Sequence, residues 1–281
     1  MSKTPQHVVI IGAGFGGMAA VKRLISKRSS TTKITIIDQK NHHLFQPLLY
    51  QVATAGLSPA EIAVPVRSVI QAGVDHVNVL MDKVIAIDSK EQLITLKSSS
   101  PLKYDVLLVA AGASHSYFGR DEWEEFAPGL KTLEHATEIR RRILQSFESA
   151  ENTDDQELRR ALLTFVIVGG GPTGVELAGS IAEISRQTLA RDFNRIDPSS
   201  TRIILIEAGK RVLGSLNESL SKRAARDLEK LGVTVWTSMR VTDVSVDGVK
   251  LGQEQVRAKT VLWAAGVKPS PMAAMLGGEI D

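Results

Sequence analysis

The sequence predicts an α/β fold in which one structural pattern occurs twice. Each copy has a run of apolar, mostly β-branched residues, then a glycine-rich turn, a helix, and a second strand that ends at an acidic residue. The first copy runs from Val8 to Asp38 and the second from Leu163 to Glu207. A glycine turn between strand and helix typically binds the pyrophosphate of a dinucleotide. We therefore expect two Rossmann-like dinucleotide-binding domains, each with a small antiparallel β layer.

The composition is that of an ordinary globular protein. Hydrophobic residues make up 43% and charged residues 23%, and the net charge of +3 is too small to indicate a nucleic-acid partner. The 281 residues contain no cysteine, which excludes a disulfide, a thiolate metal site and a redox-active cysteine pair among them. No apolar run reaches the roughly 18 residues that a membrane-spanning helix needs.

In the first copy, each glycine has a distinct expected role. Gly12 allows the tight turn, Gly14 lets the backbone approach a pyrophosphate, and Gly17 lets the helix pack closely on the strand. The second strand ends at Asp38, whose carboxylate can accept hydrogen bonds from the hydroxyls of an adenosine ribose. A second acidic residue, Glu207, ends the corresponding strand of the second copy.

Polar and aromatic residues follow the first copy over 39–57. His42 and His43 resemble a metal pair, but adjacent residues do not share a helix face and no third ligand is near, so we expect no metal site. A short helix is expected from Ser58. Runs typical of short strands then predict an antiparallel layer, and a buried parallel strand ends the domain; the runs are Val74–Met81, Asp82–Asp88, Gln92–Leu96, Leu102–Tyr104 and, for the parallel strand, Asp105–Gly112.

The middle of the chain does not repeat the strand-turn-helix pattern. Glu134–Ser149 predicts a charged helix with one apolar face, and the acidic stretch Glu148–Glu157 predicts a linker. The second copy then continues through elements like those of the first, and both copies end in Ala-Ala-Gly, at Gly112 and Gly266. The expected elements are a helix over 175–184, a strand over 202–206, a helix over 219–231 ended by Gly232, and strands over 233–236, 241–246, 248–251 and 259–263.

Two dinucleotide sites in one chain suggest electron transfer between a tightly held flavin and an exchangeable nicotinamide. The loop over 41–57 is long and could cover a flavin that stays bound in the first domain. In the second, the carboxylate of Glu207 favours NADH, because it hydrogen-bonds a 2′-hydroxyl and repels a 2′-phosphate. Lys210 and Arg211 lie nearby and can soften that preference.

Three stretches resemble the type II (non-proton-pumping) NADH:quinone oxidoreductases: Asn41–Thr54, Gly169–Glu176 and Trp263–Val267. The resemblance covers essentially the whole chain. It implies a glutathione-reductase-like architecture, non-covalent FAD, NADH as donor and a quinone as acceptor. It also implies a respiratory enzyme attached peripherally to the cytoplasmic face of the cell membrane, and it is compatible with a homodimer.

The resemblance also implies site residues. FAD contacts are expected at Gly12, Gly14, Phe15, Gly16, Asp38, Pro47, Thr54, Val84 and Gly112. NADH contacts are expected at Gly171, Pro172, Thr173, Gly174, Glu176, Glu207 and Gly266. Glu176 is the candidate catalytic residue: we place it in the first helical turn, where it either compensates the helix dipole or meets the nicotinamide and hands on a proton.

The resemblance divides the chain into four segments. Residues 1–112 are expected to begin the FAD-binding domain, 113–159 to be a helical segment of that domain, 160–266 to be the NADH-binding domain, and 267–281 to start the return to the FAD domain. Members of the family continue past this point with a membrane-attachment region. For the 281 residues alone we therefore expect a soluble fragment that holds FAD weakly or not at all and has NADH:quinone activity near zero.

Two other interpretations stay open. Sulfide:quinone oxidoreductases and disulfide reductases use cysteines, which are lacking here. Reductases of the ferredoxin or rubredoxin type need none and share both glycine turns, although the stretch over 41–57 argues against them. A nucleotide-binding fragment without turnover is the alternative from another class, and a flavin spectrum would separate it from an enzyme.

Overall fold

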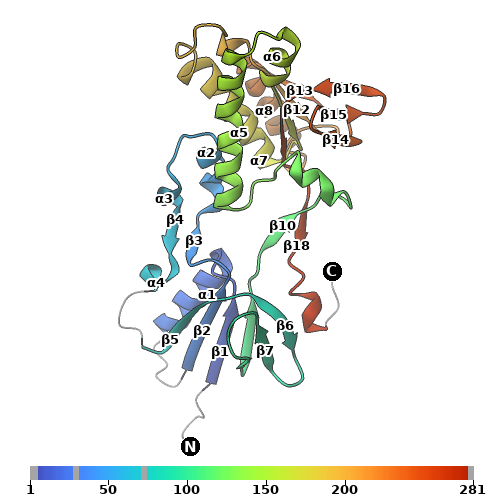
Figure 1. The fold of residues 1–281 in the computed structure, drawn as a ribbon. Helices are drawn as coiled ribbons and strands as arrows, with labels where there is room; N and C mark the ends of the chain where they lie inside the picture. Colours follow the sequence, from blue (N-terminus) through green and yellow to red (C-terminus); the bar gives the residue numbers. More distant parts are fainter. Residues whose placement is uncertain (1–5, 28–31, 71–74, 278–281) are drawn as a thin grey trace, which may run out of the picture. The chain divides into compact units, whose positions relative to one another are not determined.

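The computed structural model describes residues 6–27, 32–70 and 75–277 (Figure 1). The chain forms two compact units. The first unit contains Met1–Phe45, Ala60–Ser114 and Lys268–Asp281, and the second contains Gln46–Pro59 and His115–Val267. Among the described residues, no helix combines the length and apolar character needed to cross a membrane.

The first unit is an α/β layer with a small side sheet. Its elements are β1 (Gln6–Ile11), α1 (Phe15–Ser26), β2 (Thr32–Asp38), β3 (His42–Leu44), α3 (Pro59–Ile62), β4 (Ala63–Pro65), α4 (Val66–Val69), β5 (Val77–Met81), β6 (Val84–Asp88), β7 (Leu93–Leu96), β8 (Leu102–Lys103), β9 (Val106–Val109) and η5 (Ala274–Leu276). Strands β10 (Ala113–His115) and β18 (Val267–Pro269) pair where the chain passes between the units.

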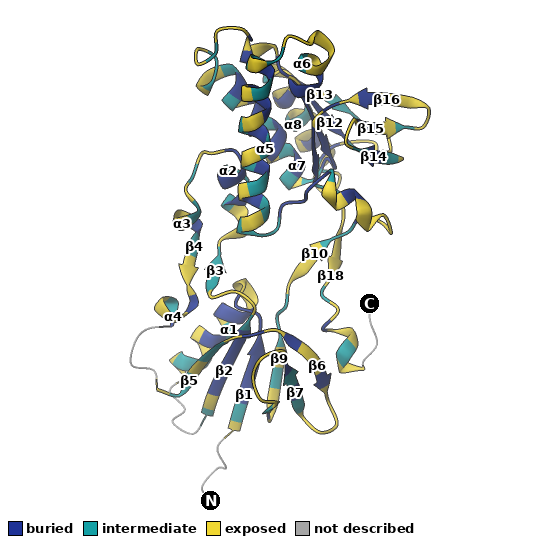
Figure 2. Cartoon of the chain, in the orientation of Figure 1, coloured by how far each residue is buried: buried dark blue, intermediate teal, exposed yellow. Residues whose placement is uncertain are grey.

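The main sheet of the first unit is parallel, in the order β5-β2-β1-β9. Strands β1 and β2 are apolar on both faces because α1 covers one face, through Met18 and Val21, and the side sheet β6-β7-β8 covers the other. Figure 2 shows these central strands buried over most of their length. The predicted first strand-turn-helix-strand copy is confirmed.

Two expected strands of this unit form, but the first pairs differently and the second is less buried than we expected. We placed Val74–Met81 in the antiparallel layer, but β5 pairs in parallel with β2, and Val74 itself lies outside the described residues. We also expected a buried strand over 105–112, yet Val106 and Leu108 on β9 are 46% and 40% exposed. The reason is position: among the described residues β9 lies at an edge of the sheet, so one of its faces is less covered.

The second unit repeats this architecture. Its elements are η1 (Gln46–Leu48), α2 (Leu49–Ala53), η2 (Asp121–Glu125), α5 (Leu133–Asn152), α6 (Gln156–Leu162), β11 (Thr164–Val168), α7 (Pro172–Glu183), a π-helical turn η3 (Ile184–Thr188), η4 (Pro198–Ser200), β12 (Arg202–Ile206), α8 (Glu218–Lys230), β13 (Val233–Trp236), β14 (Asp243–Ser245), β15 (Gly248–Leu251), β16 (Glu254–Arg257) and β17 (Thr260–Trp263).

The parallel sheet of the second unit has the order β13-β12-β11-β17, which matches the first sheet strand for strand. The antiparallel side layer is β14-β15-β16. The sequence did not predict β16, because in Glu254–Arg257 only Val256 is buried and the apolar signal is a single residue. The other predicted strands of this unit are confirmed within one or two residues at each end.

Helix α5 belongs to the second unit, although we had assigned 113–159 to the first domain. Its apolar face is buried, and the ring centroid of Phe147 lies 5.5 Å from that of Phe165 on β11 and 6.1 Å from that of Phe193. The expected linker Glu148–Glu157 is mostly helical. Asp155 caps α6 by accepting from two backbone N–H groups, so only the short stretch 153–155 joins α5 to α6.

We expect Phe147→Ala to lower the free energy of unfolding by about 3 to 5 kcal/mol, because a fully buried ring between α5 and β11 leaves a cavity. Denaturant unfolding followed by circular dichroism measures this. The control is Leu220→Ala, at a position 51% exposed on α8, with an expected change of about 0.5 kcal/mol or less. Equal effects of the two substitutions would contradict the placement of α5.

Candidate functional site

The glycines of the first turn divide into packing and open positions. Gly12 has a φ of 102°, and a Cβ there would lie 2.3 Å from the carbonyl oxygen of Ala110. A Cβ on Gly17 would lie 1.8 Å from the carbonyl oxygen of Gly12. At Gly14 a Cβ would meet nothing within 4 Å, so the backbone there is open to a ligand. The tight turn predicted at Gly12 and the close helix packing predicted at Gly17 are both confirmed.

The carboxylate of Asp38 is held by backbone donors. One oxygen accepts from the N–H of Ala13 at 2.6 Å and the other from the N–H of Lys40 at 2.8 Å. Each carboxylate oxygen has a second lone pair, so the group can still accept from ribose hydroxyls. The turn, the N-terminus of α1 and this acid together fit the adenosine and pyrophosphate parts of a dinucleotide such as FAD.

Three aromatic side chains lie together at the start of α1 in the first unit. The ring of Phe15 makes edge-to-face contacts with His43 and Phe45, at centroid distances of 5.2 and 5.6 Å. His43 also hydrogen-bonds the carbonyl oxygen of Ala13 through Nδ1, at 2.8 Å. The sequence pointed to Phe15 but not to this role of His43, whose signal was only its place in a polar and aromatic stretch. In the described part of the chain no group of three or more His, Cys, Asp or Glu could hold a metal.

The other residues expected near FAD are distributed unevenly. Gly16 lies in the first turn of α1, and Gly112 has a φ of 67° just after β9. Val84 is buried in the core on the far side of β1 from α1, so only its backbone remains for a ligand. Pro47 and Thr54 belong to the second unit, where the Thr54 hydroxyl donates to the carbonyl oxygen of Tyr50.

The second turn reproduces the geometry of the first. Gly169 has a φ of 111°, and a Cβ there would lie 2.6 Å from the carbonyl carbon of Ala264. A Cβ on Gly174 would lie 1.8 Å from the carbonyl oxygen of Gly169, whereas Gly171 is open. Pro172 starts α7 with a φ suited to the first helical position. The backbone N–H groups at this helix start point toward the space above the turn.

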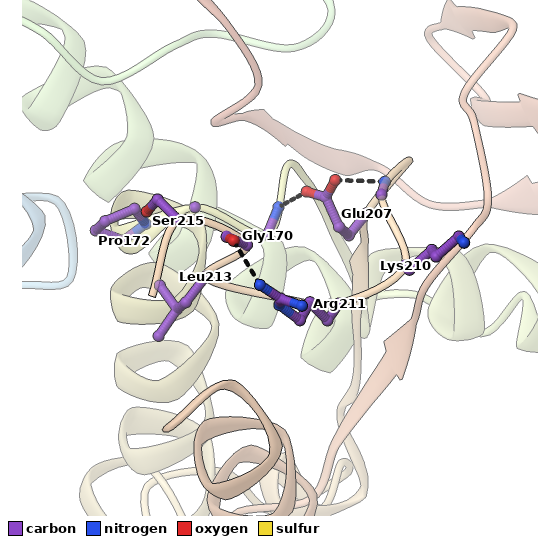
Figure 3. Close-up of a pocket in the computed structure, with 10 residues that line it drawn as sticks. Gly170, Pro172, Glu207, Lys210, Arg211, Leu213 and Ser215 are labelled. Atoms are coloured by element: carbon purple, nitrogen blue, oxygen red, sulfur yellow. Dashed lines mark hydrogen bonds between the residues drawn. The ribbon is translucent and has the colours of Figure 1, made fainter. Parts of the chain in front are cut away.

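Glu207 and the loop after it form a cavity of about 360 Å³ beside this turn (Figure 3). Its carboxylate accepts from the N–H of Gly170 and from the N–H of Gly209, both at 2.6 Å. Arg211 donates to the carbonyl oxygen of Gly214 at 2.9 Å, which commits its side chain to its own loop. The cavity is lined by Gly170, Gly171, Pro172, Glu207, Gly209, Lys210, Arg211, Leu213, Gly214 and Ser215.

Glu176 does not lie in the first helical turn, as we expected. Helix α7 begins at Pro172, so Glu176 is in the second turn, and no acidic residue lies in the first. A dipole-compensating role is correspondingly weak at this position. The residue is exposed to solvent, but the protein atoms around its carboxyl group remove part of its hydration. This partial desolvation raises the pKa of Glu176 above the usual value. Thr173 lies in the first turn, and Gly266, with a φ of 78°, follows β17.

Comparison with known proteins places this geometry in a family. The family described as pyridine nucleotide-disulphide oxidoreductase matches residues 6–281. The chain belongs to this family. The 281 residues contain no cysteine, so no disulphide forms among them.

Within the pyridine nucleotide-disulphide oxidoreductases, the chain is similar to proteins named as NADH dehydrogenases. It is 45% identical to the type II NADH:quinone oxidoreductase NdhA of Mycobacterium tuberculosis, over 98% of this chain and 60% of that protein. It is 32% identical to a probable NADH dehydrogenase of Dictyostelium discoideum, over 98% of this chain and 62% of that one. The chain thus spans about 60% of the length of these relatives.

The fold is also that of a solved structure, NDH2 from Plasmodium falciparum in complex with NADH. The TM-score is 0.86 at 22% identity, over 95% of this chain and 56% of that one. The predicted fold class is confirmed by this likeness.

We expect Gly171→Ala and Gly174→Ala to separate binding from folding. The first adds a methyl group that meets no protein atom, so it should cost about 1 kcal/mol or less of stability but weaken NADH binding about tenfold, by keeping the pyrophosphate from the backbone. The second forces α7 away from the turn and should cost about 3 kcal/mol.

Urea unfolding measures the stability of both variants, and quenching of tryptophan fluorescence by NADH measures binding. Wild-type affinity for NADH in a folded Gly171→Ala protein would contradict the assignment of the open glycine to the pyrophosphate.

Proposed function

We propose that the protein is an FAD-dependent NADH dehydrogenase that passes electrons to a quinone. The observation that carries the proposal is the duplicated turn, in which an open glycine lies beside a carboxylate fixed by two backbone N–H groups. Two such sites suit a pair of dinucleotides, one resident and one exchanged. The similarity to NADH:quinone oxidoreductases supports this pairing and the choice of acceptor.

The first turn is the proposed FAD site. Asp38 would hold the ribose of the adenosine, and the start of α1 at Phe15 would place free N–H groups against the pyrophosphate. The rings of Phe15 and Phe45, 48% and 43% exposed, offer apolar surface beside the turn. When bound, FAD supplies the two-electron chemistry that the side chains of this chain lack.

The second turn is the proposed NADH site. Glu207 would accept a hydrogen bond from the ribose 2′-hydroxyl, and its negative charge would repel the 2′-phosphate of NADPH. Lys210 and Arg211 are the residues we expected to soften this preference. Lys210 lines the cavity, whereas Arg211 hydrogen-bonds the carbonyl oxygens of its own loop. This engagement supports NADH over NADPH.

Glu176 is the proposed proton-holding residue. Its raised pKa lets the carboxyl group keep a proton at higher pH than an ordinary glutamate, and it lies one helical turn past Pro172 at the start of α7. In that position it would meet the nicotinamide side of a bound nucleotide and hold a proton at its carboxyl oxygen.

The acceptor and the location are the remaining parts of the proposal. Other similar proteins are named as external NADH-ubiquinone oxidoreductases of mitochondria, which supports a membrane quinone as acceptor. Peripheral attachment to the cytoplasmic face of the cell membrane, and a homodimeric assembly, rest on the resemblance of the sequence. A ferredoxin-type acceptor is the competing choice, since the fold is shared with putidaredoxin reductase at a TM-score of 0.75 and 20% identity.

We expect the full-length protein, extended to the length of its relatives and reconstituted with FAD, to be yellow and to be bleached by NADH without oxygen. The visible absorption band of the flavin reports both events. Reoxidation by a short-chain quinone, with none by an iron–sulfur protein, selects the quinone acceptor; the opposite result selects the ferredoxin type. Failure to bind FAD under any condition would contradict the proposal.

We expect Glu207→Gln to reduce the preference for NADH over NADPH about tenfold, because the charge that repels the 2′-phosphate is removed. An amide cannot accept from both Gly170 and Gly209, so binding of both nucleotides should also weaken. The ratio of the two dissociation constants is therefore the informative quantity. An unchanged ratio would show that Glu207 does not contact the ribose.

A further inference from the structure

The topology of the second unit assigns the two ends of a dinucleotide to different strands. β11 lies between β12 and β17, so the order in which the strands are added to the sheet reverses at β11. A ligand bound at such a reversal crosses the carboxyl end of the central strand. Glu207 ends β12 and marks the adenosine side. The other half must therefore extend over the end of β17, at Ala264–Gly266. The backbones of turn and strand meet there, since a Cβ on Gly169 would lie 2.6 Å from the carbonyl carbon of Ala264.

Phe118 lies at that place, and its side chain is exposed. Its side chain is 71% exposed, the highest value for a large hydrophobic residue in the described part of the chain. Its ring reaches the end of β17: a Cβ on Gly266 would lie 2.6 Å from its Cζ atom. The ring meets Trp263 only at a centroid distance of 6.3 Å, edge to face.

The backbone of Phe118 is in an unfavourable conformation. Its φ is 53°, in the left-handed region that bulky residues avoid, and Gly119 follows with a φ of 88°. Such a conformation persists only where the surrounding structure imposes it. A glycine or asparagine would occupy the position at lower cost, so the aromatic ring itself requires an explanation.

Hydrogen bonds hold the segment around Phe118 in place. The N–H of Ser116 donates to the carbonyl oxygen of Gly266 at 3.3 Å, and the indole N–H of Trp263 donates to the carbonyl oxygen of Ser116 at 2.9 Å. Tyr117, directly before Phe118, is buried and stacks on Trp263 at 5.1 Å. The ring of Phe118 is thus presented from a rigid base over Gly266.

We propose that Phe118 is a positioning residue that packs against the nicotinamide end of NADH bound at the second turn. The inference rests on the proposed function of that turn. A flat, exposed aromatic ring at the end of β17, packed against Gly266, suits a planar, largely apolar ligand, because two rings in offset or edge contact attract each other. Phe118 would then restrict the rotation of the nicotinamide. It would add to the affinity for NADH without contributing to the binding of the adenosine half.

The test compares NADH with ADP-ribose, which carries both riboses and the pyrophosphate but no nicotinamide. Binding is measured by calorimetry on the 281-residue chain, and it requires no flavin. We expect Phe118→Ala to weaken NADH about five- to tenfold and ADP-ribose less than about twofold. Phe118→Tyr keeps the ring and should bind NADH as the wild type does.

Phe118→Gly is the matched control for folding. It removes the ring and also relieves the left-handed backbone, so it should melt at or above the wild-type temperature while losing NADH affinity as Phe118→Ala does. A variant that is no less stable but selectively loses NADH cannot owe that loss to unfolding.

Two outcomes would overturn the inference, and they are distinguishable. If the wild type binds both ligands and Phe118→Ala changes neither affinity, or changes both equally, Phe118 does not contact the nicotinamide and the proposed site remains. If the wild type binds neither NADH nor ADP-ribose, the proposed function of the second turn fails, and the role of Phe118 fails with it.

Discussion

The structure depends on one close approach, made twice, between the start of a helix and the turn that precedes it. Gly17 lies against the carbonyl of Gly12 and Gly174 against that of Gly169, at distances that no side chain can enter. This contact seats each helix on its central strand, and it aims the helix N-terminus at the carboxyl edge of the sheet. The open glycine, the acidic residue and the closing Ala-Ala-Gly segment are all positioned relative to it.

The same scaffold carries two chemically different surroundings. In the first unit, Phe15, His43 and Phe45 add aromatic surface beside the turn. In the second, the loop after Glu207 is tied to the turn by the N–H of Leu213, which donates to the carbonyl oxygen of Gly170. Duplication therefore conserves the backbone that holds a pyrophosphate, while the neighbouring segments distinguish one ligand from the other.

Local patterns in the sequence were sufficient to predict both nucleotide-binding cores. Continuous apolar runs located the central strands, and glycine spacing predicted which glycines pack and which stay open. Non-local features were harder. Nothing in the composition of β5 shows that it pairs with β2, and the amphipathic pattern of α5 predicts a buried face without saying that Phe147 meets Phe165.

The candidate site shows the same division. Asp38 and Glu207 were predictable because each ends a strand that follows a glycine turn. The exposed ring of Phe118 was not, because its meaning depends on Gly266, which lies far away in the sequence. Glu176 was misplaced by one helical turn because a glycine motif does not specify the residue at which the following helix begins. In the structure α7 begins at Pro172.

The contact between Gly170 and Glu207 has a consequence for attempts to redesign cofactor choice. A Cβ on Gly170 would lie 2.9 Å from the Cβ of Glu207, and every residue except glycine carries that atom, so position 170 has no room for a side chain whichever residue replaces the acid. The two positions are coupled through the hydrogen bond that the N–H of Gly170 donates to the carboxylate of Glu207 at 2.6 Å, so a change at 207 also changes the pairing of the backbone at 170. Libraries that vary position 207 alone would sample mostly sequences with a gap in the turn and an unpaired N–H at Gly170.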